Sequence, residues 1–397
     1  MLILKPEDTR SKNAITILHL LMKKDSISRV DLSRTTGLTK TTISSIINKF
    51  IALSLVEESS TISTGNVGKN PIPLRIRTDA VHTIGIHLGR QKVKSVLMDA
   101  RMNIISKTEG LSYERPCPKE IFKSLFLSID DSLKEAEKRN IKVGAIGIGV
   151  PGPLDARTGV VKHPPKFKGW KDVPLGKIVQ ERYNKLPVWI ENDANVGVLA
   201  EKWHGGGRDL RNFVYILANE GMGAGVVIDN KLYQGAYDYV GEIGHMLFYD
   251  HGKFRYLEDI SGVDNIIKRA RSKGLDIKNI GDMQNYLQAN NKAAKSIVRD
   301  IAPLIGSAVI NVIHIIGPEE VFIGGKMAGL GDALLQPIKE IVSQYLFGDQ
   351  EVEVKLSEIS EDAVAVGAAI NATTKWLEKK SIEHAYAERR WEKDKNY

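Results

Sequence analysis

The sequence predicts two parts: a mostly helical winged helix-turn-helix unit in residues 1–77, followed by a larger α/β domain. Two observations support this division. Residues 1–77 carry 12 basic and 6 acidic side chains, a net charge of +6 out of the chain's +8, and contain three helical segments. From Val81 onward, apolar runs rich in β-branched residues are broken by glycine turns and alternate with longer helical patterns, as in α/β domains.

The composition restricts the function classes. One cysteine, Cys117, excludes a disulfide framework and a zinc site built from several thiolates, and it fits a reducing cytosol. The first residues lack the apolar core of a secretory signal. The apolar stretches are shorter than the roughly 20 residues that a bilayer requires, so we expect a cytoplasmic protein without a membrane partner. The local positive charge makes nucleic acid the first partner to test.

The first three elements are expected to be helices. Residues 13–24 place apolar side chains at helical spacing and end in lysines, which suit a helix C-terminus. Ser28 followed by Asp31 is an acidic variant of the capping box that begins a second helix, and Gly37 ends it. Thr39 is a good N-cap for the third helix. Two helices joined by a glycine-containing turn form the helix-turn-helix layout.

The third helix has an apolar stripe of Ile43, Ile46, Ile47 and Phe50. Its short polar side chains therefore face away, where they can reach base edges between flanking lysines. Residues 56–77 are expected to form a basic hairpin, the wing. A solvated helical cap is the alternative, because most polar helix faces only contact water. Charge, turn and wing together favour DNA. The expected DNA contacts are Lys40, Thr41, Ser44, Ser45, Asn48, Lys49, Lys69 and Arg75.

The α/β region contains two stretches that begin alike. Residues 84–98 and 214–228 each open with a strand and a glycine-rich turn, so we expect two related lobes. The lobes would together span 78–376, with the first at about 78–205 plus the C-terminal helix, the second at about 206–360, and a charged tail at 377–397. For the tail, a solvated helix is favoured over an oligomer contact.

Asn192 and Asp193 follow an apolar strand, LPVWI, and open a helix. Both side chains therefore lie at the carboxyl end of a strand, where α/β proteins bind ligands. Sugar hydroxyls donate and accept hydrogen bonds, and a carboxylate beside an amide can hold two neighbouring hydroxyls. The alternative for Asp193 is a plain helix cap. The pair indicates a sugar site.

Three motifs carry a family resemblance: Gly147-Ile-Gly-Val-Pro-Gly152, Glu191-Asn-Asp-Ala-Asn195 and Gly241-Glu-Ile-Gly-His245. From about residue 80 to 375 the chain resembles the ROK family of sugar kinases and repressors, which implies the actin-like, two-lobed ATPase fold, related to ribonuclease H. The N-terminal part resembles the winged helix of the repressor branch, which includes xylose and N-acetylglucosamine repressors. The resemblance implies sugar contacts from Asn192, Asp193, Glu242, His245 and Glu258.

The nucleotide end departs from the family pattern. Family kinases have a glycine-rich phosphate turn preceded by an acidic residue that helps hold magnesium. Here His87 replaces the acid, and Arg90 and Gln91 replace the second glycine and a hydroxyl residue, which obstructs close backbone approach by a phosphate. In the second loop Glu220 replaces a threonine, and its charge would repel a triphosphate. The remaining loop glycines are Gly89, Gly221, Gly223, Gly225, Gly324 and Gly325.

The region after His245 departs as well. Much of the family carries a cysteine-rich loop there, whose three cysteines bind zinc together with that histidine. This chain has no cysteine in the stretch, and Tyr256 stands where the last one is expected. Structural zinc needs four ligands, which one histidine cannot supply; His251 with Asp250 is only a loose substitute. We expect no family-type zinc and no other cofactor.

These observations predict a sugar-responsive transcription regulator, a repressor of carbohydrate-utilisation genes that binds operator DNA and a monosaccharide or its derivative. Helix-turn-helix proteins read paired half-sites, so we expect a homodimer or higher homo-oligomer. One alternative is an ATP- and magnesium-dependent sugar kinase with an added DNA-binding domain, in which Asp193 is the general base. Another is a sugar-binding protein whose N-terminal unit contacts a protein. The sequence leaves the sugar and the direction of its effect open.

Overall fold

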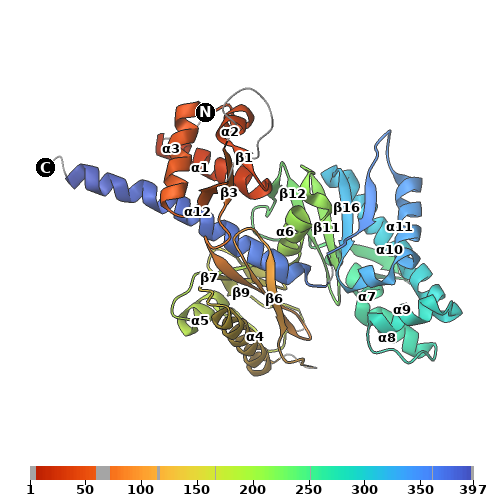
Figure 1. Ribbon diagram of the computed structural model, residues 1–397. Helices are drawn as coiled ribbons and strands as arrows, with labels where there is room; N and C mark the ends of the chain where they lie inside the picture. The colour runs from red at the N-terminus through yellow and green to blue at the C-terminus, as the bar shows by residue number, and fades with distance from the viewer. Residues whose placement is uncertain are drawn as a thin grey trace.

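The computed structural model describes residues 6–59, 72–113, 117–165, 167–250, 252–359 and 361–394, with side chains from residue 9 to 382. Figure 1 shows three units: the N-terminal winged helix and two α/β lobes. The chain ends in a long helix, α12 (Ala363–Asp394), that runs from between the lobes to the winged helix. This arrangement fits the expected order of domains along the chain.

The winged helix has the predicted local signals. Ser28 accepts a hydrogen bond from the Asp31 backbone N–H at 3.1 Å, Gly37 ends the second helix with a φ of 70°, and Thr39 accepts from the Thr42 N–H at 3.2 Å. The first helix begins at Pro6, well before the predicted start, because its first turns are polar and show no apolar period. The elements are α1 Pro6–Lys23, β1 Ile27–Ser28, α2 Arg29–Thr36, α3 Lys40–Ala52, β2 Val56–Glu58 and β3 Pro73–Ile76.

The first lobe is built on a five-stranded sheet of order β10-β7-β4-β5-β6. Its middle strand β4 pairs parallel with β7 and antiparallel with β5. Helices α4 and α5 pack on its outer face (Figure 1). The elements are β4 His82–Leu88, β5 Val93–Met98, β6 Ile104–Glu109, α4 Pro118–Lys138, β7 Val143–Val150, β8 Leu154–Asp155, β9 Val160–Val161, α5 Leu175–Arg182 and β10 Val188–Asn192.

The second lobe repeats this plan. Its sheet has the order β13-β12-β11-β16-β17, with β11 antiparallel to β12 and parallel to β16, so the prediction of two related lobes is confirmed. The elements are α6 Asp193–His204, β11 Phe213–Ala218, β12 Met222–Ile228, β13 Lys231–Leu232, β14 Leu247–Asp250, β15 Lys253–Tyr256, α7 Leu257–Ser261, α8 Val263–Ser272, α9 Ile280–Gln288, α10 Lys292–Ile316, β16 Glu320–Gly324, α11 Asp332–Tyr345 and β17 Glu353–Leu356, with short 3₁₀ helices at Gly206–Arg208, Ile243–His245 and Lys326–Leu330.

Two helices fill the space between the sheets. Helix α12 packs on β4 and β7, and α6 packs on β11 and β12 as well as on α12. The expected lobe boundary near residue 205 is therefore too late, because α6 covers the second sheet. Missing side chains permit these contacts: a Cβ on Gly367 would lie 1.7 Å from the Val196 carbonyl oxygen, and one on Gly85 2.1 Å from that of Ala365.

The winged helix shares its core with the first lobe. Val81, Ala100 and Leu377 are buried in the same apolar cluster as the side chains of α1 and α3. Leu377 and Ser381 are buried, so the expected tail from residue 377 is wrong in its start: α12 continues unbroken and its first turns past 377 pack inward. The winged helix is thus fixed to α12.

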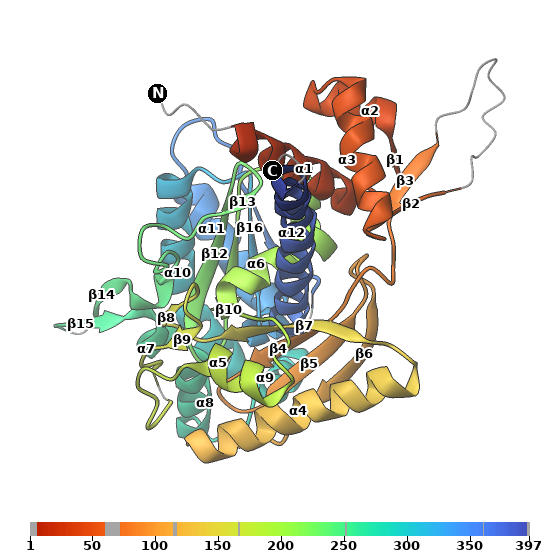
Figure 2. The ribbon, with the colours of Figure 1, turned by 90° about the vertical axis from the view of Figure 1, so that its left-hand side faces the viewer.

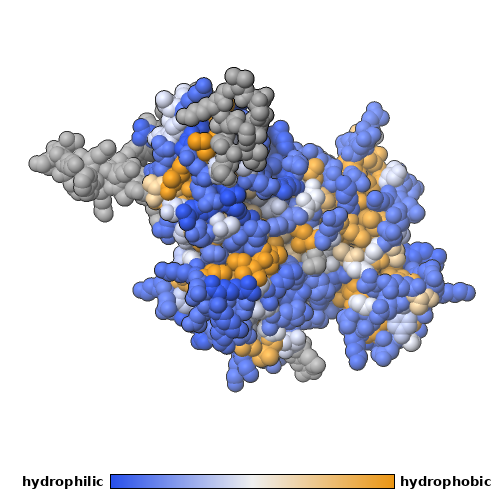
Figure 3. All heavy atoms as spheres, viewed as in Figure 1, coloured by the Kyte–Doolittle hydropathy of each residue, from blue (hydrophilic) through white to orange (hydrophobic). Residues whose placement is uncertain are grey.

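The remaining surface is mostly hydrophilic, with hydrophobic patches over the second lobe and beneath the winged helix (Figure 3). One helix, α10, is 25 residues long and apolar enough to cross a membrane by length and composition, which the sequence interpretation overlooked. Of its most apolar window, 61% is buried inside the molecule. Side chains such as Ile301 and Ile305 lie in the second lobe's core, so α10 is a core helix.

Candidate functional site: the cleft between the lobes

A cleft of about 490 Å³ separates the lobes. It lies at the carboxyl ends of the central strands, as expected for an α/β ligand site. The lining residues include all five expected sugar contacts, which are Asn192, Asp193, Glu242, His245 and Glu258. Four of the six loop glycines, Gly89, Gly221, Gly223 and Gly325, also line it. Gly225 and Gly324 do not: a Cβ on Gly225 would lie 2.4 Å from the Ala194 carbonyl oxygen, and one on Gly324 2.2 Å from the Tyr215 hydroxyl, so both serve packing.

Asn192 caps α6. Its Oδ1 accepts hydrogen bonds from the backbone N–H groups of Ala194 at 2.9 Å and Asn195 at 3.3 Å. The N-cap is therefore Asn192, although Asp193 Oδ1 also accepts from the Ala194 N–H at 2.9 Å and so takes part in capping the same helix. Glu191 connects the start of α6 to the second lobe, because its carboxylate accepts from Asn195 Nδ2 at 3.0 Å and from Gln234 Nε2 at 2.8 Å. The sequence motif contained Glu191 but gave it no role.

Asp193 faces the cleft in a poorly solvated position. Burial raises the pKa of its carboxyl to about 6, and the Glu242 carboxylate adds to this, while the Arg90 guanidinium and the Ala194 N–H oppose it. Above that pKa the group is a carboxylate, whose Oδ1 accepts from the Ala194 N–H at 2.9 Å. As a charged acceptor in the cleft lining, it can bind a sugar hydroxyl.

Glu242, His245 and Glu258 form the opposite wall. Burial raises the pKa of Glu242, against the lowering effect of His245, whose Nδ1 lies 3.4 Å from Glu242 Oε2. Glu258 Oε2 accepts from the Met222 N–H at 3.4 Å. Gly241 has a φ of 85°, and a Cβ on it would lie 1.7 Å from the Ala224 carbonyl oxygen. The glycine thus lets the motif approach β12 and present its acids to the cleft.

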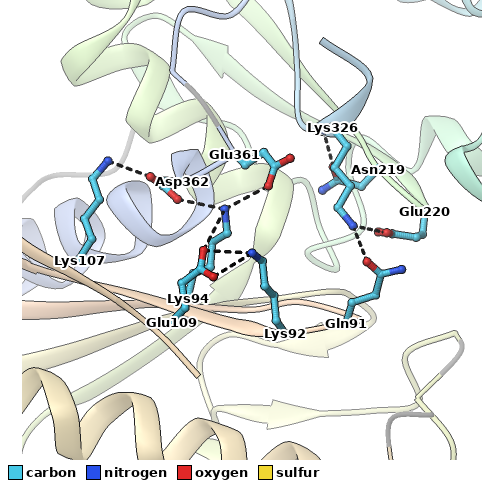
Figure 4. Close-up of polar contacts among 10 residues, drawn as sticks. All are labelled: Gln91, Lys92, Lys94, Lys107, Glu109, Asn219, Glu220, Lys326, Glu361 and Asp362. Carbon is cyan, nitrogen blue, oxygen red and sulfur yellow. Dashed lines mark hydrogen bonds and ion pairs between the residues drawn. The ribbon is translucent and has the colours of Figure 1, made fainter. Parts of the chain in front are cut away.

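The expected nucleotide end contains a polar bridge between the lobes (Figure 4). Lys326 Nζ, from the second lobe, donates to Gln91 Oε1 of the first lobe at 2.9 Å and forms an ion pair with Glu220. The Lys326 backbone N–H donates to Asn219 Oδ1 at 2.8 Å. Glu220 therefore has a cationic partner within the chain. Sequence reasoning missed Lys326, because nothing near it in sequence indicates its partners.

A second polar cluster lies beside this bridge. Lys94 Nζ contacts Glu361 at 3.1 Å and Asp362 at 3.2 Å, and Lys92 Nζ contacts Glu109 at 3.0 Å. His87, in the place of the expected magnesium-binding acid, is half-buried here. Burial and the neighbouring Lys94, Lys326 and Lys92 lower the pKa of His87 to about 3, so it is neutral. It adds no charge for a metal or a phosphate.

The hairpin β14–β15 follows the GEIGH motif. The ring of Tyr256 packs edge-on against His245, with ring centroids 5.0 Å apart. Asp250 lies 3.3 Å from Arg255, and His251 is outside the described residues. Across the described ranges, no group of three or more histidine, cysteine, aspartate or glutamate side chains is placed to hold a metal ion. The absence of family-type zinc stays a prediction.

The expected DNA face of α3 points outward. Lys40, Thr41, Ser45 and Asn48 are exposed, and Ser44 and Lys49 are half-buried. Lys69 lies outside the described residues, and β2 and β3 form the base of the expected wing. Arg75 lies 2.9 Å from Glu57, which also binds Arg101 of the first lobe, so it belongs to the domain joint. Arg29, which sequence reasoning missed, donates to Asn48 Oδ1 at 3.1 Å.

Comparison with known proteins gives the same division of the chain. The ROK family model matches residues 83–375, and a winged helix-turn-helix DNA-binding model matches residues 10–57. A putative xylose repressor of Caldicellulosiruptor sp. is 32% identical over 379 residues, covering 89% of this chain and 94% of the relative. A xylose repressor of Caldicellulosiruptor bescii is 29% identical, with the same coverage.

The fold has a solved counterpart along nearly its full length. The crystal structure of a ROK-family transcriptional regulator, a homologue of the Escherichia coli Mlc protein, superposes with a TM-score of 0.80 at 22% identity, covering 95% of this chain and 98% of the other. Family and DNA-binding matches together span the winged helix and both lobes. The chain belongs to the ROK family and, with its N-terminal winged helix, to the sugar-responsive DNA-binding transcriptional repressors of that family.

Proposed function

We propose that this repressor binds a monosaccharide or its derivative in the cleft between the lobes, and that the bound sugar changes its affinity for operator DNA. The observation that carries the proposal is the convergence of Asn192, Asp193, Glu242, His245 and Glu258 on one cleft from both lobes. Carboxylates and an amide at this density suit a ligand rich in hydroxyls. The names of the relatives make D-xylose the first sugar to test.

A continuous set of packed helices connects the cleft to the DNA-binding unit. Asp193 begins α6, α6 packs along α12, and α12 packs on α1 of the winged helix. A sugar that draws Asp193 and Glu242 together would shift α6 against α12. Because a ligand moves an equilibrium only by its differential affinity for two states, the proposed switch is lobe closure that changes the spacing of two winged helices.

The test is thermal-shift screening of a sugar panel, followed by operator binding with the best ligand. A ligand that binds only the folded chain raises its melting temperature. We expect one or a few monosaccharides to raise it and to change DNA affinity, and the Asp193→Asn variant to lose both effects. A panel without any hit, or a hit that leaves DNA affinity unchanged, contradicts the proposal.

Sugar phosphorylation is the second candidate function, favoured by one observation: Asp193 is poised in the cleft with a pKa of about 6, as a general base requires. The bridge of Lys326 to Gln91 and Glu220 argues against it, because it joins the loops that the resemblance assigns to the nucleotide phosphates. Without phosphate and magnesium positioning, phosphoryl transfer loses most of its catalysis. Steady ADP release with any panel sugar would establish the kinase.

We propose a homodimer or higher homo-oligomer in the cytoplasm as the working form. Paired half-sites about one helical turn apart require two winged helices on one face of the DNA. Light scattering at micromolar concentration is expected to give at least twice the mass of 44.0 kDa. A monomer that binds a palindromic operator with a single-site isotherm would contradict this assembly. We also propose that the repressor works without zinc; stoichiometric zinc in elemental analysis would refute that.

A further inference from the structure

We propose that Asn48 reads a guanine in each operator half-site through its side-chain NH₂ group, and that Arg29 sets this preference by holding the amide oxygen. Helix-turn-helix proteins read bases from the exposed face of the second helix of the motif. Neither the match to a winged helix-turn-helix model nor the names of the relatives assign a role to either residue. The inference follows from the hydrogen bonds of one amide and does not depend on the proposed sugar effect.

Asn48 is placed to reach bases. It lies on α3, four residues after Ser44 and three after Ser45, so the three side chains share one face of the helix. Asn48 and Ser45 are exposed and Ser44 is half-buried, whereas the buried side chains of α3 lie on the other side. The major groove admits a helix that presents such a polar face to the base edges.

Arg29 fixes the orientation of the Asn48 amide. Arg29 Nη2 donates to Asn48 Oδ1 at 3.1 Å, and because a guanidinium has donors only, the amide atom that faces it must be the oxygen. Asn48 Nδ2 has no hydrogen-bond partner within the residues that the structure describes. Asn48 therefore offers DNA two N–H donors. The neighbouring serine hydroxyls rotate to donate or to accept, so they distinguish bases less well.

Arg29 is itself held on its other side. Its Nη1 forms an ion pair with Glu58, the last residue of β2, and only 27% of the Arg29 side chain is exposed. Helices α2 and α3 contact each other and α3 contacts β2, so one guanidinium connects three packed elements (Figure 2). Because Glu58 neutralises its charge, Arg29 is poorly suited to bind a phosphate. Arg29 is therefore a positioning residue for Asn48.

The donor pattern of Asn48 selects the base. In the major groove, guanine presents two acceptors, N7 and O6, whereas cytosine presents an NH₂ donor. An asparagine with both ends of its amide available pairs with adenine instead, because its oxygen accepts from adenine N6 while its nitrogen donates to N7. Since Arg29 already binds the oxygen of Asn48, the adenine pair loses one of its two hydrogen bonds. Guanine is then the better partner.

The experiment selects binding sites from a random library of DNA duplexes with the full-length repressor, without and with D-xylose. The variants are Asn48→Ala, Asn48→Asp and Arg29→Ala. Arg34→Ala is the matched control, because Arg34 is a second arginine of α2 that pairs with Asp31, and 78% of its side chain is exposed. Fluorescence anisotropy on the selected site, and on versions with each other base at the position that Asn48 governs, then gives affinity and its salt dependence.

We expect the wild-type chain to prefer guanine at one position of each half-site, by roughly 5- to 20-fold over cytosine. Asn48→Ala should lose the preference at that position alone, and Asn48→Asp, whose carboxylate only accepts, should favour cytosine there. Arg29→Ala frees the amide and should shift the preference to adenine, with an unchanged salt dependence. Arg34→Ala should select the same sites as the wild type.

Three results would overturn the inference. An unchanged base profile for Asn48→Ala means that Asn48 reads no base. A wild-type preference for any base other than guanine at the position that Asn48 governs means that Arg29 does not restrict the amide. Weaker binding of Arg29→Ala to every sequence by the same factor, with a smaller salt slope, makes Arg29 a phosphate contact. The first two results need no Arg29 variant, so they decide the question even if Arg29→Ala fails to fold.

Discussion

Asn192 and Asp193 are neighbours whose side chains share one hydrogen-bond donor, the Ala194 N–H. Asn192 Oδ1 also accepts from the Asn195 N–H, and both residues line the cleft. Burial raises the Asp193 pKa from 3.8 to about 6. The charged form of Asp193 therefore lowers the free energy of unfolding, which is typical of groups at functional sites. A ligand hydroxyl would replace part of the lost hydration.

Asp193→Asn is expected to stabilise the chain and weaken sugar binding. Because the folded pKa is raised, the folded state takes up a proton that the unfolded state releases, so stability falls as the pH rises from about 3.8 through about 6. The amide removes that penalty, worth on the order of 1–2 kcal/mol at pH 8 for a partly exposed group. Scanning calorimetry should show a gain that is larger at pH 8 than at pH 5, with sugar affinity reduced roughly 10- to 100-fold.

Asp155→Asn provides the control of opposite sign. Its carboxylate accepts from the Thr158 and Arg157 N–H groups, which lower the pKa of Asp155. That stabilisation is present above the unfolded pKa and is lost as the pH falls, so the amide variant should be less stable at pH 8. If both variants shift the melting temperature in the same direction at pH 8, the conclusion that the Asp193 charge destabilises the folded chain is wrong.

Lys49→Ala is expected to weaken binding to every DNA sequence by a similar factor. Lys49 flanks the polar face of α3, where a phosphate contact releases counterions. The slope of log affinity against log salt should fall by about 0.9. Arg75→Ala is the matched control: its guanidinium is engaged by Glu57, so the slope should stay unchanged. An unchanged slope for Lys49→Ala, measured by fluorescence anisotropy, would show that this face of α3 is not the DNA surface.

At the scale of elements, the crossing of α6 and α12 is the proposed link between the cleft and the winged helix. The helices approach closely where Gly367 meets the backbone of Val196, and α12 sits on β4 and β7 over Gly85 and Gly147. Close-packed interiors transmit small shifts because they do not compress. At these glycines, we expect a small shift of α6 or of the first sheet to be transmitted to α12.

Gly367→Ala is expected to separate these helices. Its new Cβ would lie 1.7 Å from the Val196 carbonyl oxygen, so α12 must move, at a cost of about 1–3 kcal/mol. The effect of sugar on DNA affinity should shrink, although Asp193 is untouched. Gly329→Ala is the control, because its Cβ would meet no atom nearer than 3.8 Å. Full retention of the sugar effect in a folded Gly367→Ala variant would exclude this crossing as the route.

At the scale of the whole molecule, the winged helix is joined to the ROK domain at several points. Leu377 enters the winged helix core from α12. His19 lies 2.7 Å from Glu378, and Lys23 3.5 Å from Asp209. The ion pairs are exposed and contribute little, so the shared apolar core provides most of the connection.

Leu377→Ala is expected to loosen that connection. Removing a fully buried leucine costs about 2–5 kcal/mol, and here the loss falls on the joint. Calorimetry should show the winged helix unfolding as a separate, earlier transition. Leu334→Ala, an equally buried leucine in the second lobe, should lower the stability of that lobe without releasing the winged helix. If the thermograms of the Leu377→Ala and Leu334→Ala variants show the same transitions, the connection between the winged helix and the ROK domain does not depend on Leu377.

Much of the fold and of the site follows from local sequence. Ser28, Gly37 and Thr39 act at the positions that capping chemistry predicts, because caps bond within a few residues. The meeting of the five expected sugar contacts in one cleft was predictable, because strand ends and family motifs indicate them. The DNA contact of Arg75 stays a prediction, and its ion pair with Glu57 could not be foreseen, because Glu57 lies on the neighbouring strand.

The sequence by itself determined the winged helix, the two related lobes, the residues expected to bind sugar and the altered phosphate turn, because periodicity, caps and motifs are local properties. Only the tertiary structure decided which charges pair. Lys326 pairs with Glu220 across 106 positions of the chain, and the Arg90 charge acts on the carboxylates of Asp193 and Glu242. Such pairings depend on how the lobes close over α6 and α12. The physical reason is that the type of a side chain is known from its own position in the sequence, whereas its partner depends on how distant elements pack.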